Sequence, residues 1–331
     1  MNKALNITTK IILIIILVIL AFITGVRTYF RFPVRKFYKT CEKSFVIPDS
    51  NKNFIAQGLS YSEENGNFYL TGYMKDHSAS PIYIVNKNTK KLVKKLGIIN
   101  PDGSDFTGHN GGLTIFKNKI IITGGEDKCL YIFDKNTIDQ AENKSNVTYE
   151  DTISLETNQD YISSAFTNVI KAEDGDLLVT GEFYREPNYK TLESHTVETC
   201  DGQNKALALA FKFEDGNFIP VKAFSIRGLV QGMAFNNNKV YLSTSWGTGF
   251  SYLYVYDLDK VEAVSKDIMG KELPLYVLDS KSLVEEIKLF PMSEEIEVLD
   301  NKLYIINESA SNKYIFGKFT SGKFCYYIDL D

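Results

Sequence analysis

Residues 57–72 read QGLSYSEENGNFYLTG and residues 111–124 read GGLTIFKNKIIITG, and this pattern decides the fold. Three later segments share it: TNVIKAEDGDLLVTG from Thr167, QGMAFNNNKVYLSTS from Gln231 and EEIEVLDNKLYIINES from Glu294. Each copy has a short strand, a turn containing Asn-Gly, Asn-Lys or Asp-Gly, and a second strand, which is the chemistry of a β-hairpin. The chain therefore contains five copies of one repeat.

A third strand with alternating aromatic residues follows each hairpin, and a fourth strand follows in four of the five copies. The third strands begin at PIYIVNK, CLYIFDK, ALALAFKFE, YLYVYDLD and CYYIDLD. The fifth copy stops after its third strand, whereas an unpartnered strand, KTCEKSFVIP at residues 39–48, precedes the first copy. Placing that strand on the last copy would close a ring and remove two exposed edges.

A single copy cannot bury its own apolar face, so the copies are expected to pack side by side in a ring. The sequence predicts an all-β fold, a five-bladed β-propeller of four-stranded blades closed by an N-terminal strand and preceded by one transmembrane helix. A six-bladed ring is the alternative, but only five inner-strand patterns can be counted. The segments 185–205, 260–275 and 310–323 are expected to be insertions between strands, and such loops often carry function.

Composition limits the classes of partner and site. The net charge of -4, without a basic stripe, argues against a nucleic-acid partner. Cys41, Cys129, Cys200 and Cys325 are far apart and form no C-x-x-C motif, so no zinc site is predicted. No cofactor is predicted either, although a cation bound in the channel stays open. Isolated thiols are expected, and Cys41 with Cys325 is the pair that one blade would bring together.

Residues 11–26, IILIIILVILAFITGV, carry no charge, which is typical of a membrane-spanning helix. A cleaved signal peptide is the alternative, but no small-x-small cleavage pattern follows the run, which favours an uncleaved signal anchor. The predicted organisation is a short N-terminal tail (1–10), a transmembrane signal anchor (11–30), a basic juxtamembrane linker (31–38) and the β-propeller (39–331).

Two features of the sequence predict opposite sides of the membrane for the propeller. Basic residues flank the run on both sides: Lys3 and Lys10 before it, and Arg27, Arg31, Arg35, Lys36 and Lys39 after it. The positive-inside rule would then keep the propeller in the cytoplasm. An apolar N-terminal segment before a β-rich domain is, however, the common arrangement for export. We expect a single-pass protein of the cell membrane with an extracytoplasmic propeller.

Over residues 40–331 the repeats resemble the broad bacterial β-propeller superfamily that includes quinoprotein-like and strictosidine-synthase-like domains. A narrower likeness lies in NFIAQGLSY, residues 53–61, which is similar to the F-T-Q-G-L opening of plant-type glutaminyl cyclases, themselves five-bladed propellers. The later tryptophan-rich and glutamate motifs of that family are not matched, because the only tryptophan, Trp246, has a different context. The resemblance implies a fold, and no catalytic residue is carried over from it.

The inner strands of a propeller converge on a central channel, where ligands often meet the loops at one end. The repeat alignment places Gln57, Gly111, Thr167, Gln231 and Glu294 at equivalent positions. The predicted channel or ligand-site residues are Gln57, His109, Asn110, Thr167, Arg227, Gln231, Trp246, Glu294, Glu295 and Glu308. Such a ring of donors and acceptors suits a ligand. Polar residues in a narrow channel also bind one another and trapped water.

Three of these features have specific alternatives. His109 lies among glycines, so its imidazole would act as a base or metal ligand, or would cap a tight turn. Glu294, Glu295 and Glu308, with Glu182, would bind a cation or hold a proton; otherwise Glu295 or Glu297 pairs with Arg227 or Lys313. Trp246 would form an aromatic surface at a loop, or pack in the core.

No complete catalytic constellation can be assembled from the sequence. The first hypothesis is therefore a membrane-anchored binding module at the cell surface, with a small molecule, peptide or protein as its partner. The alternative is an extracytoplasmic hydrolase or glutaminyl-cyclase-like transferase with its site at the channel, and a structural scaffold is the third. Convergence of His109, Gln231, Glu294 and Arg227 on one open pocket would favour a ligand site or an enzyme.

Overall fold

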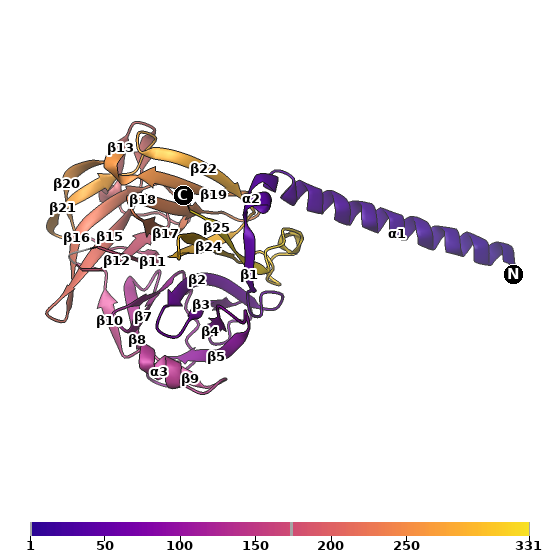
Figure 1. The fold of residues 1–331 in the computed structure, drawn as a ribbon, viewed down its shortest axis with the longest axis horizontal. Coiled ribbons are helices and arrows are strands. Elements are labelled where there is room, and N and C mark those ends of the chain that lie inside the picture. The colour runs from indigo at the N-terminus through magenta and orange to yellow at the C-terminus, as the bar shows by residue number, and fades with distance from the viewer. Residues whose placement is uncertain (1, 173–174, 331) are drawn as a thin grey trace.

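Five large sheets stand around a central channel as the blades of a propeller, and one long helix projects from it (Figure 1). The structure is a computed structural model that describes residues 2–172 and 175–330, and the counts of elements below refer to these residues. Residues 173–174, within which the Asp-Gly turn of the third copy is predicted to begin, lie outside them. The prediction of five blades, rather than six, is confirmed for this part of the chain.

The blades are given from the channel outward. The first consists of β2 (Phe54–Ser62), β3 (Asn67–Met74), β4 (Pro81–Asn86) and β5 (Leu92–Ile99), with β9 (Asn146–Thr148) added outside. The second consists of β6 (Leu113–Phe116), β7 (Lys119–Thr123), β8 (Cys129–Asp134) and β10 (Asp151–Ser154). The third consists of β11 (Ser164–Ile170), β12 (Leu177–Glu182), β15 (Ala206–Glu214) and β16 (Asn217–Ile226), extended by β21 (Lys271–Val277) and β20 (Glu262–Ile268).

The fourth blade consists of β17 (Val230–Asn236), β18 (Lys239–Thr244), β19 (Ser251–Asp257) and β22 (Leu283–Leu289). The fifth consists of β23 (Ser293–Leu299), β24 (Lys302–Asn307), β25 (Phe324–Asp329) and β1 (Glu42–Val46). A separate hairpin is formed by β13 (Val197–Thr199) and β14 (Gly202–Asn204). The helices are α1 (Asn2–Arg31), α2 (Arg35–Thr40) and α3 (Lys135–Gln140), with short 3₁₀ turns η1 (Glu193–His195), η2 (Leu258–Lys260) and η3 (Phe316–Phe319).

The N-terminal strand closes the ring, as predicted. β1 pairs antiparallel with β25, so that Glu42 lies opposite Tyr327 and Val46 opposite Phe324. The last blade is thus completed by the first strand of the chain, and the two chain ends are held together by backbone hydrogen bonds.

Neighbouring blades also exchange strands. The insertion at 260–275 forms the hairpin β20–β21, which leaves the fourth blade and pairs parallel with β16 of the third, with Ala223 opposite Leu275. In the same way β9 leaves the second blade and pairs parallel with β5 of the first. These exchanges give the third blade six strands and the first blade five, whereas four were predicted for each.

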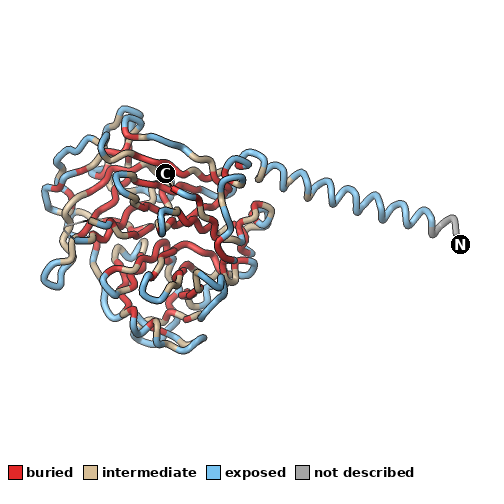
Figure 2. Tube along the Cα trace, in the orientation of Figure 1, coloured by how far each residue is buried: buried red, intermediate tan, exposed pale blue. Residues whose placement is uncertain are grey.

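The core is divided among the interfaces between blades. Within the described residues, five buried hydrophobic clusters each fill the space between two neighbouring blades. Figure 2 shows this burial along the strands, while α1 is exposed over most of its described length and is buried at Phe30 near its C-terminal end. The segment 31–38, expected to be a linker, includes the start of α2, and Val34 and Phe37 are buried against the fourth and fifth blades.

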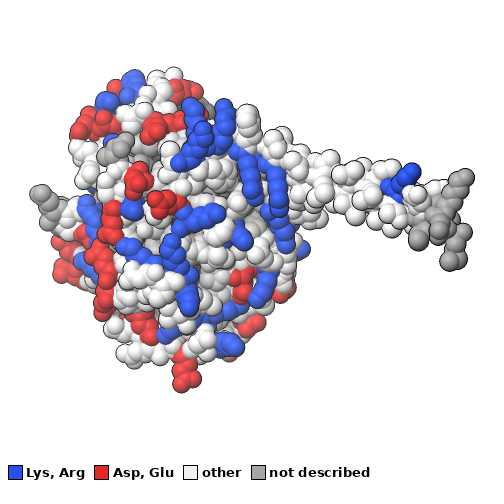
Figure 3. All heavy atoms as spheres, turned by 45° about the vertical axis from the view of Figure 1, so that its right-hand side comes forward, with Lys and Arg blue, Asp and Glu red and all other residues white. Residues whose placement is uncertain are grey.

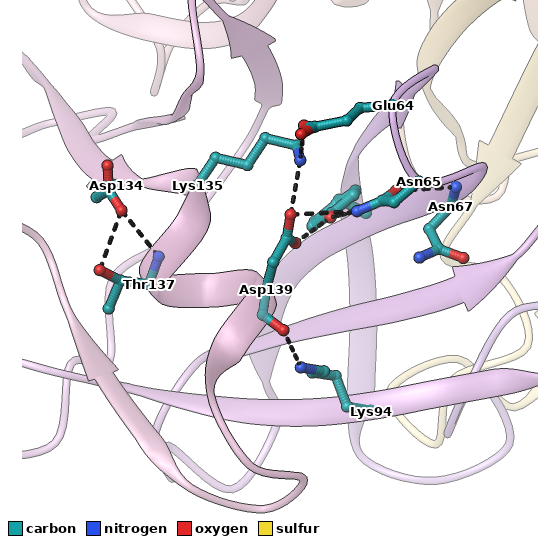
Figure 4. A network of polar contacts seen from close by, with 9 residues as sticks. Glu64, Asn65, Asn67, Lys94, Asp134, Lys135, Thr137 and Asp139 are labelled. Atoms are coloured by element: carbon teal, nitrogen blue, oxygen red, sulfur yellow. Dashed lines mark hydrogen bonds and ion pairs between the residues drawn. The ribbon is translucent and has the colours of Figure 1, made fainter.

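The second blade carries the short helix α3 directly after β8. Asp134 caps α3 by accepting hydrogen bonds from the backbone N–H of Thr137 at 2.8 Å and from its hydroxyl at 3.0 Å. The buried ammonium of Lys135 binds Asp139 at 2.6 Å and Glu64 of the first blade at 2.8 Å (Figure 4). The helix therefore ties two blades together through a paired charge.

The four cysteines lie within the described residues and form no disulfide. Cys41 and Cys325, the pair singled out from the sequence, are both free thiols.

Ring closure can be tested at Phe45, which is 2% exposed on β1 and packs its ring against Phe68 of the first blade at 5.1 Å. We expect Phe45→Ala to lower the free energy of unfolding by about 3–5 kcal/mol, because it removes a buried aromatic ring from the closing interface. Val46→Ala is the control, since Val46 is 49% exposed on the same strand, and its effect should be below about 1 kcal/mol. Denaturant unfolding of the full chain measures both. Equal losses would show that β1 does not lock the ring.

Candidate functional site

Four inner strands begin with a β-bulge at the same end of the channel. The bulges fall between Ala56 and Gly58, Ser164 and Phe166, Val230 and Gly232, and Ser293 and Ile296. A bulge inserts an extra residue and re-aims its side chain. The bulges contain Gln57, Ala165, Gln231 and, in the fifth blade, the pair Glu294 and Glu295, which together face one residue of β24. The predicted equivalence of Gln57, Gln231 and Glu294 is therefore correct.

The equivalence predicted for Thr167 is wrong by two residues. The bulge register puts Ala165 at that position, whereas Thr167 is fully buried and its hydroxyl donates to the carbonyl of Val179 at 2.9 Å. The bulge is set by how β11 pairs with β12, which the hairpin pattern alone does not specify.

A polar network occupies this end of the channel, which we call the channel mouth: Gln57, Tyr73, His109, Ser245, Glu294, Glu308, Lys313 and Tyr314. Gln57 donates its amide N–H to Glu308 at 3.1 Å, and its amide oxygen accepts from Nε2 of His109 at 2.9 Å. The hydroxyl of Tyr314 donates to the other oxygen of Glu308 at 2.6 Å. The carboxyl group of Glu308 is thus bonded by an inner strand of the first blade and by the loop that follows β24.

His109 is held as a neutral imidazole. The amide oxygen of Gln57 can only accept, so Nε2 carries the proton and Nδ1 keeps its lone pair. His109 is partly exposed to solvent, and desolvation of its ring together with the charge of Lys313 lowers its pKa to about 4. Its ring packs on that of Tyr73 at 4.3 Å, and the ammonium of Lys313 donates to the Tyr73 hydroxyl.

Two glutamates of the mouth are protonated more readily than ordinary carboxyl groups. Burial raises the pKa of Glu308 to about 7. Burial and the nearby charge of Glu308 raise the pKa of Glu294 well above its usual range, against a 3.4 Å hydrogen bond from the Ser245 hydroxyl. Both carboxyl groups therefore hold a proton more strongly than exposed carboxyl groups do, which suits groups that exchange protons near neutral pH.

Glu295 closes the channel below the mouth. It is fully buried, and Oε2 accepts from the backbone N–H of Thr167 across the ring at 3.4 Å. A Cβ on Gly112 or Gly232 would lie 2.9 Å from its carboxyl oxygens, so these glycines leave the space that the side chain fills. Burial raises the pKa of Glu295 well above its usual range. Its Oε1 has no hydrogen-bond partner among the described residues.

The opposite end of the channel opens into a separate cavity of about 690 Å³. Glu297 lines it, and burial raises the pKa of Glu297 to about 8. The side chain of Asn168 bonds Glu297 at 3.4 Å and the carbonyl of Ile296 at 3.0 Å. Glu295 and Glu297 therefore do not pair with Arg227 or Lys313.

Arg227 and Trp246 lie outside the channel, which corrects their placement in one ring with Glu294. Both line a cleft of about 950 Å³ between the third and fourth blades. The guanidinium of Arg227 stacks on Tyr254 at 3.5 Å, and that of Arg185 on Trp246 at 3.9 Å. Ser245 also lines this cleft, so its contact with Glu294 joins the cleft to the mouth.

Asn110 and Gln231 are two further residues of the predicted site. Asn110 is fully buried and donates to the Thr71 hydroxyl at 3.3 Å. Gln231 occupies its bulge. Because Arg227 lines the cleft, whose lining includes none of His109, Gln231 and Glu294, these four residues do not converge on one pocket. Among residues 2–172 and 175–330, no three His, Cys, Asp or Glu side chains are grouped so as to hold a metal ion.

Glu182 is separate from the other glutamates and belongs to a buried ionic cluster. His195 is 1% exposed, and its two ring nitrogens contact Glu182 at 2.9 Å and Asp160 at 2.8 Å. Burial lowers the pKa of His195, but the hydrogen bonds and charges of both carboxyl groups outweigh this and raise it. Asp160 also accepts from the backbone of Met269, so the cluster fastens the insertion at 185–205 to the β20–β21 hairpin.

Sequence reasoning missed Tyr73, Ser245, Lys313 and Tyr314. Tyr73 closely follows Thr71 and Gly72 near the end of β3, and Ser245 follows β18 directly. The second strand of each hairpin ends at the same mouth where the first begins. The sequence could have indicated Tyr73 and Ser245 by their position at or just after the end of a second strand. It could have indicated Lys313 and Tyr314 by their position in the 310–323 insertion.

The chain has only low similarity to known proteins. No protein-family model and no curated protein sequence matches the chain. The glutaminyl cyclase of Myxococcus xanthus is 9% identical with a TM-score of 0.44, over 87% of this chain and 94% of that one. A luciferin-regenerating enzyme is 11% identical with a TM-score of 0.42, again over 87% and 94%. A chain of a nidogen/laminin complex is 10% identical with a TM-score of 0.38, over 76% and 72%. These values carry no conclusion about chemistry.

The raised pKa of Glu308 makes the stability of the fold depend on pH. The folded state binds the proton with a pKa of about 7, against an ordinary value of 4.5, so this stabilising contribution is complete below about pH 4.5 and lost as pH rises through 7. We expect Glu308→Gln to be more stable than the wild type by about 1–3 kcal/mol at pH 8, discounted for partial exposure, and nearly equal to it at about pH 5. Denaturant unfolding at both pH values tests this. Glu63→Gln, at an exposed position, is the control, and a pH-independent difference would contradict the prediction.

Proposed function

We propose that the channel mouth is an acid–base catalytic site. The observation that carries the proposal is the pair of glutamates with raised pKa values, of which Glu308 titrates near pH 7. Catalytic acids and bases need pKa values close to the working pH, and burial is the common means of shifting them. Glu308 would act as the base and Glu294 as the acid, while Gln57 and Tyr314 position the carboxyl group of Glu308.

The first reaction to test is the cyclisation of an N-terminal glutamine. Gln57 belongs to the segment that resembles the opening of glutaminyl cyclases, and it bonds both Glu308 and His109. In this reaction the α-amino nitrogen attacks the side-chain amide carbon, and the bond from that carbon to the amide nitrogen breaks. Glu308 would take the proton from the attacking amine, and Glu294 would give one to the departing nitrogen, so that the products are a pyroglutamyl peptide and ammonia.

A binding role is the second candidate, and the cleft between the third and fourth blades favours it. The cleft places two stacked arginines beside aromatic rings and next to the mouth. Arginines held in this way suit a carboxylate or another planar anionic group. The cleft would hold the remainder of a peptide whose end lies in the mouth, or would bind such a ligand without any reaction.

The membrane anchor is part of the same proposal. Residues 6–31 of α1 contain an 18-residue window with a mean hydropathy of 2.8 and are long enough to cross a bilayer. A signal sequence passes the same test, so retention of α1 is decided by N-terminal sequencing of the protein from membranes. Protease access to the propeller in intact cells decides whether it is extracytoplasmic.

We expect the purified full chain to release ammonia from a peptide that begins with glutamine, and the peptide to lose the mass of ammonia. The rate should rise as pH passes about 7, because the base must be ionised. Glu308→Gln should lower the rate by about 10²-fold or more. Glu285→Gln is the control, since Glu285 is exposed on β22 and lines neither the cleft nor the mouth. If the wild type releases no ammonia but the peptide binds, the cyclase reaction is wrong and the binding role is supported.

A further inference from the structure

The loops around the channel mouth lie beside the C-terminal end of α1. Thr248 and Phe316 line one cavity of about 310 Å³ together with Gly25 and Val26 of the helix. The ring of Tyr29 lies 6.2 Å from that of Phe250, and Arg31 donates to the carbonyl of Phe319 at 3.0 Å. Two loops that carry mouth residues, at 245–250 and 308–319, are thus fixed against the helix.

The position of these loops along the bilayer normal follows from the part of α1 beside which they lie. Gly25 and Val26 are the last residues of the uncharged run 11–26, which must lie in or next to the hydrocarbon if α1 spans the membrane. Loops that touch Gly25 and Val26 must then lie at the boundary between the hydrocarbon and the headgroups. The propeller is consequently not held away from the bilayer by a linker.

The exposed side chains of these loops fit that boundary. Ile315 is 77% exposed, Phe316 49% and Trp246 41%, although large apolar side chains are expected to be buried in a protein surrounded by water. Phe32 and Tyr29, at the end of α1, are exposed beside them. Aromatic residues concentrate at the level of the headgroups, where their rings are partly apolar and partly wet.

A basic groove adjoins the same surface. It has a volume of about 630 Å³ and is lined by five cationic residues without an acid: Arg27, Arg31, Arg35, Lys39 and Lys43. These five form no ion pair among the described residues. Figure 3 shows Lys and Arg side chains gathered where α1 meets the propeller. Each cation near an anionic membrane contributes about 1 kcal/mol to its attraction.

We propose that the face of the propeller around the channel mouth docks on an anionic bilayer, with Trp246, Ile315 and Phe316 at the headgroup level and phospholipid phosphates in the basic groove. The proposal rests on the anchoring role given to α1, and it does not depend on the reaction at the mouth. Its consequence is that the channel mouth opens at the bilayer surface, where a membrane-associated substrate would meet it.

The single tryptophan makes this docking measurable. The full chain is placed in nanodiscs of phosphatidylcholine and phosphatidylglycerol, in which the phosphatidylcholine carries brominated acyl chains that quench tryptophan on contact. We expect Trp246 emission to be lost relative to discs without bromine, and to shift to the blue. The double substitution Trp246→Phe with Phe218→Trp moves the reporter to the opposite end of the channel, beside Phe213 and Phe116, and should not be quenched.

The basic groove is tested by R27Q/R35Q/K39Q, which should reduce the quenching in anionic discs to the level found in discs of phosphatidylcholine alone. The control K239Q/K266Q/K271Q removes three charges from lysines outside the groove and should behave as the wild type. Quenching that is absent from the wild type, equal at both tryptophan positions, or unchanged by the groove substitutions would overturn the proposal. If the chain does not remain with the discs, the anchor itself is wrong, which is a separate result from an unquenched Trp246 in a chain that does remain.

Discussion

The packing of one blade face against the next is the constraint on which the structure depends. A twisted sheet of four strands leaves two apolar faces, and each face is covered only when a neighbouring blade stands beside it. Each of the interfaces described has its own buried cluster, and the one between the fifth and first blades exists only because the ring closes. The pairing of β1 with β25 is therefore a condition for burying that part of the core, and the exchanged strands β9 and β20–β21 strengthen other interfaces in the same way.

Closure of the ring also creates the electrostatic conditions at the axis. Inner strands that converge must exclude water, and glycines at 112 and 232 let the Glu295 side chain cross the channel between them. A carboxyl group in that position favours its protonated form, because its charge would be poorly solvated. Glu294 and Glu308 experience the same desolvation, but they lie next to hydrogen-bond donors at an open mouth. Groups that lower stability in this way persist where a function needs them.

The anchor and the mouth belong to one surface. Val34 and Phe37 continue the chain from α1 directly into the hydrophobic core, so the helix is joined to the ring by packing rather than by a flexible linker. The same packing orients the loops that hold Ser245 and Glu308 toward the end of the helix. A substitution that changes how α1 packs against the propeller would therefore alter the surroundings of the mouth, even where the substituted residue does not contact Glu294 or Glu308.

Much of this architecture could be predicted from the sequence, because each repeat is defined by residues that are close together in the chain. The hairpin turns, the alternating third strands and the unpartnered strand at 39–48 were sufficient to predict five blades and their closure, and the apolar run 11–26 to predict one long exposed helix. The sequence also placed Gln57, Glu294 and His109 near one mouth. It did not place Thr167 correctly, because a bulge depends on the register between two strands, nor Arg227 and Trp246, because the tilt of a blade decides which side of it a loop faces. The pairing of Gln57 with Glu308, 251 residues apart, joins the first and fifth blades.

The sequence by itself determined the repeat and the chemical groups available. Only the tertiary structure decided which of those groups share a desolvated site, since both burial and proximity arise when the ring closes.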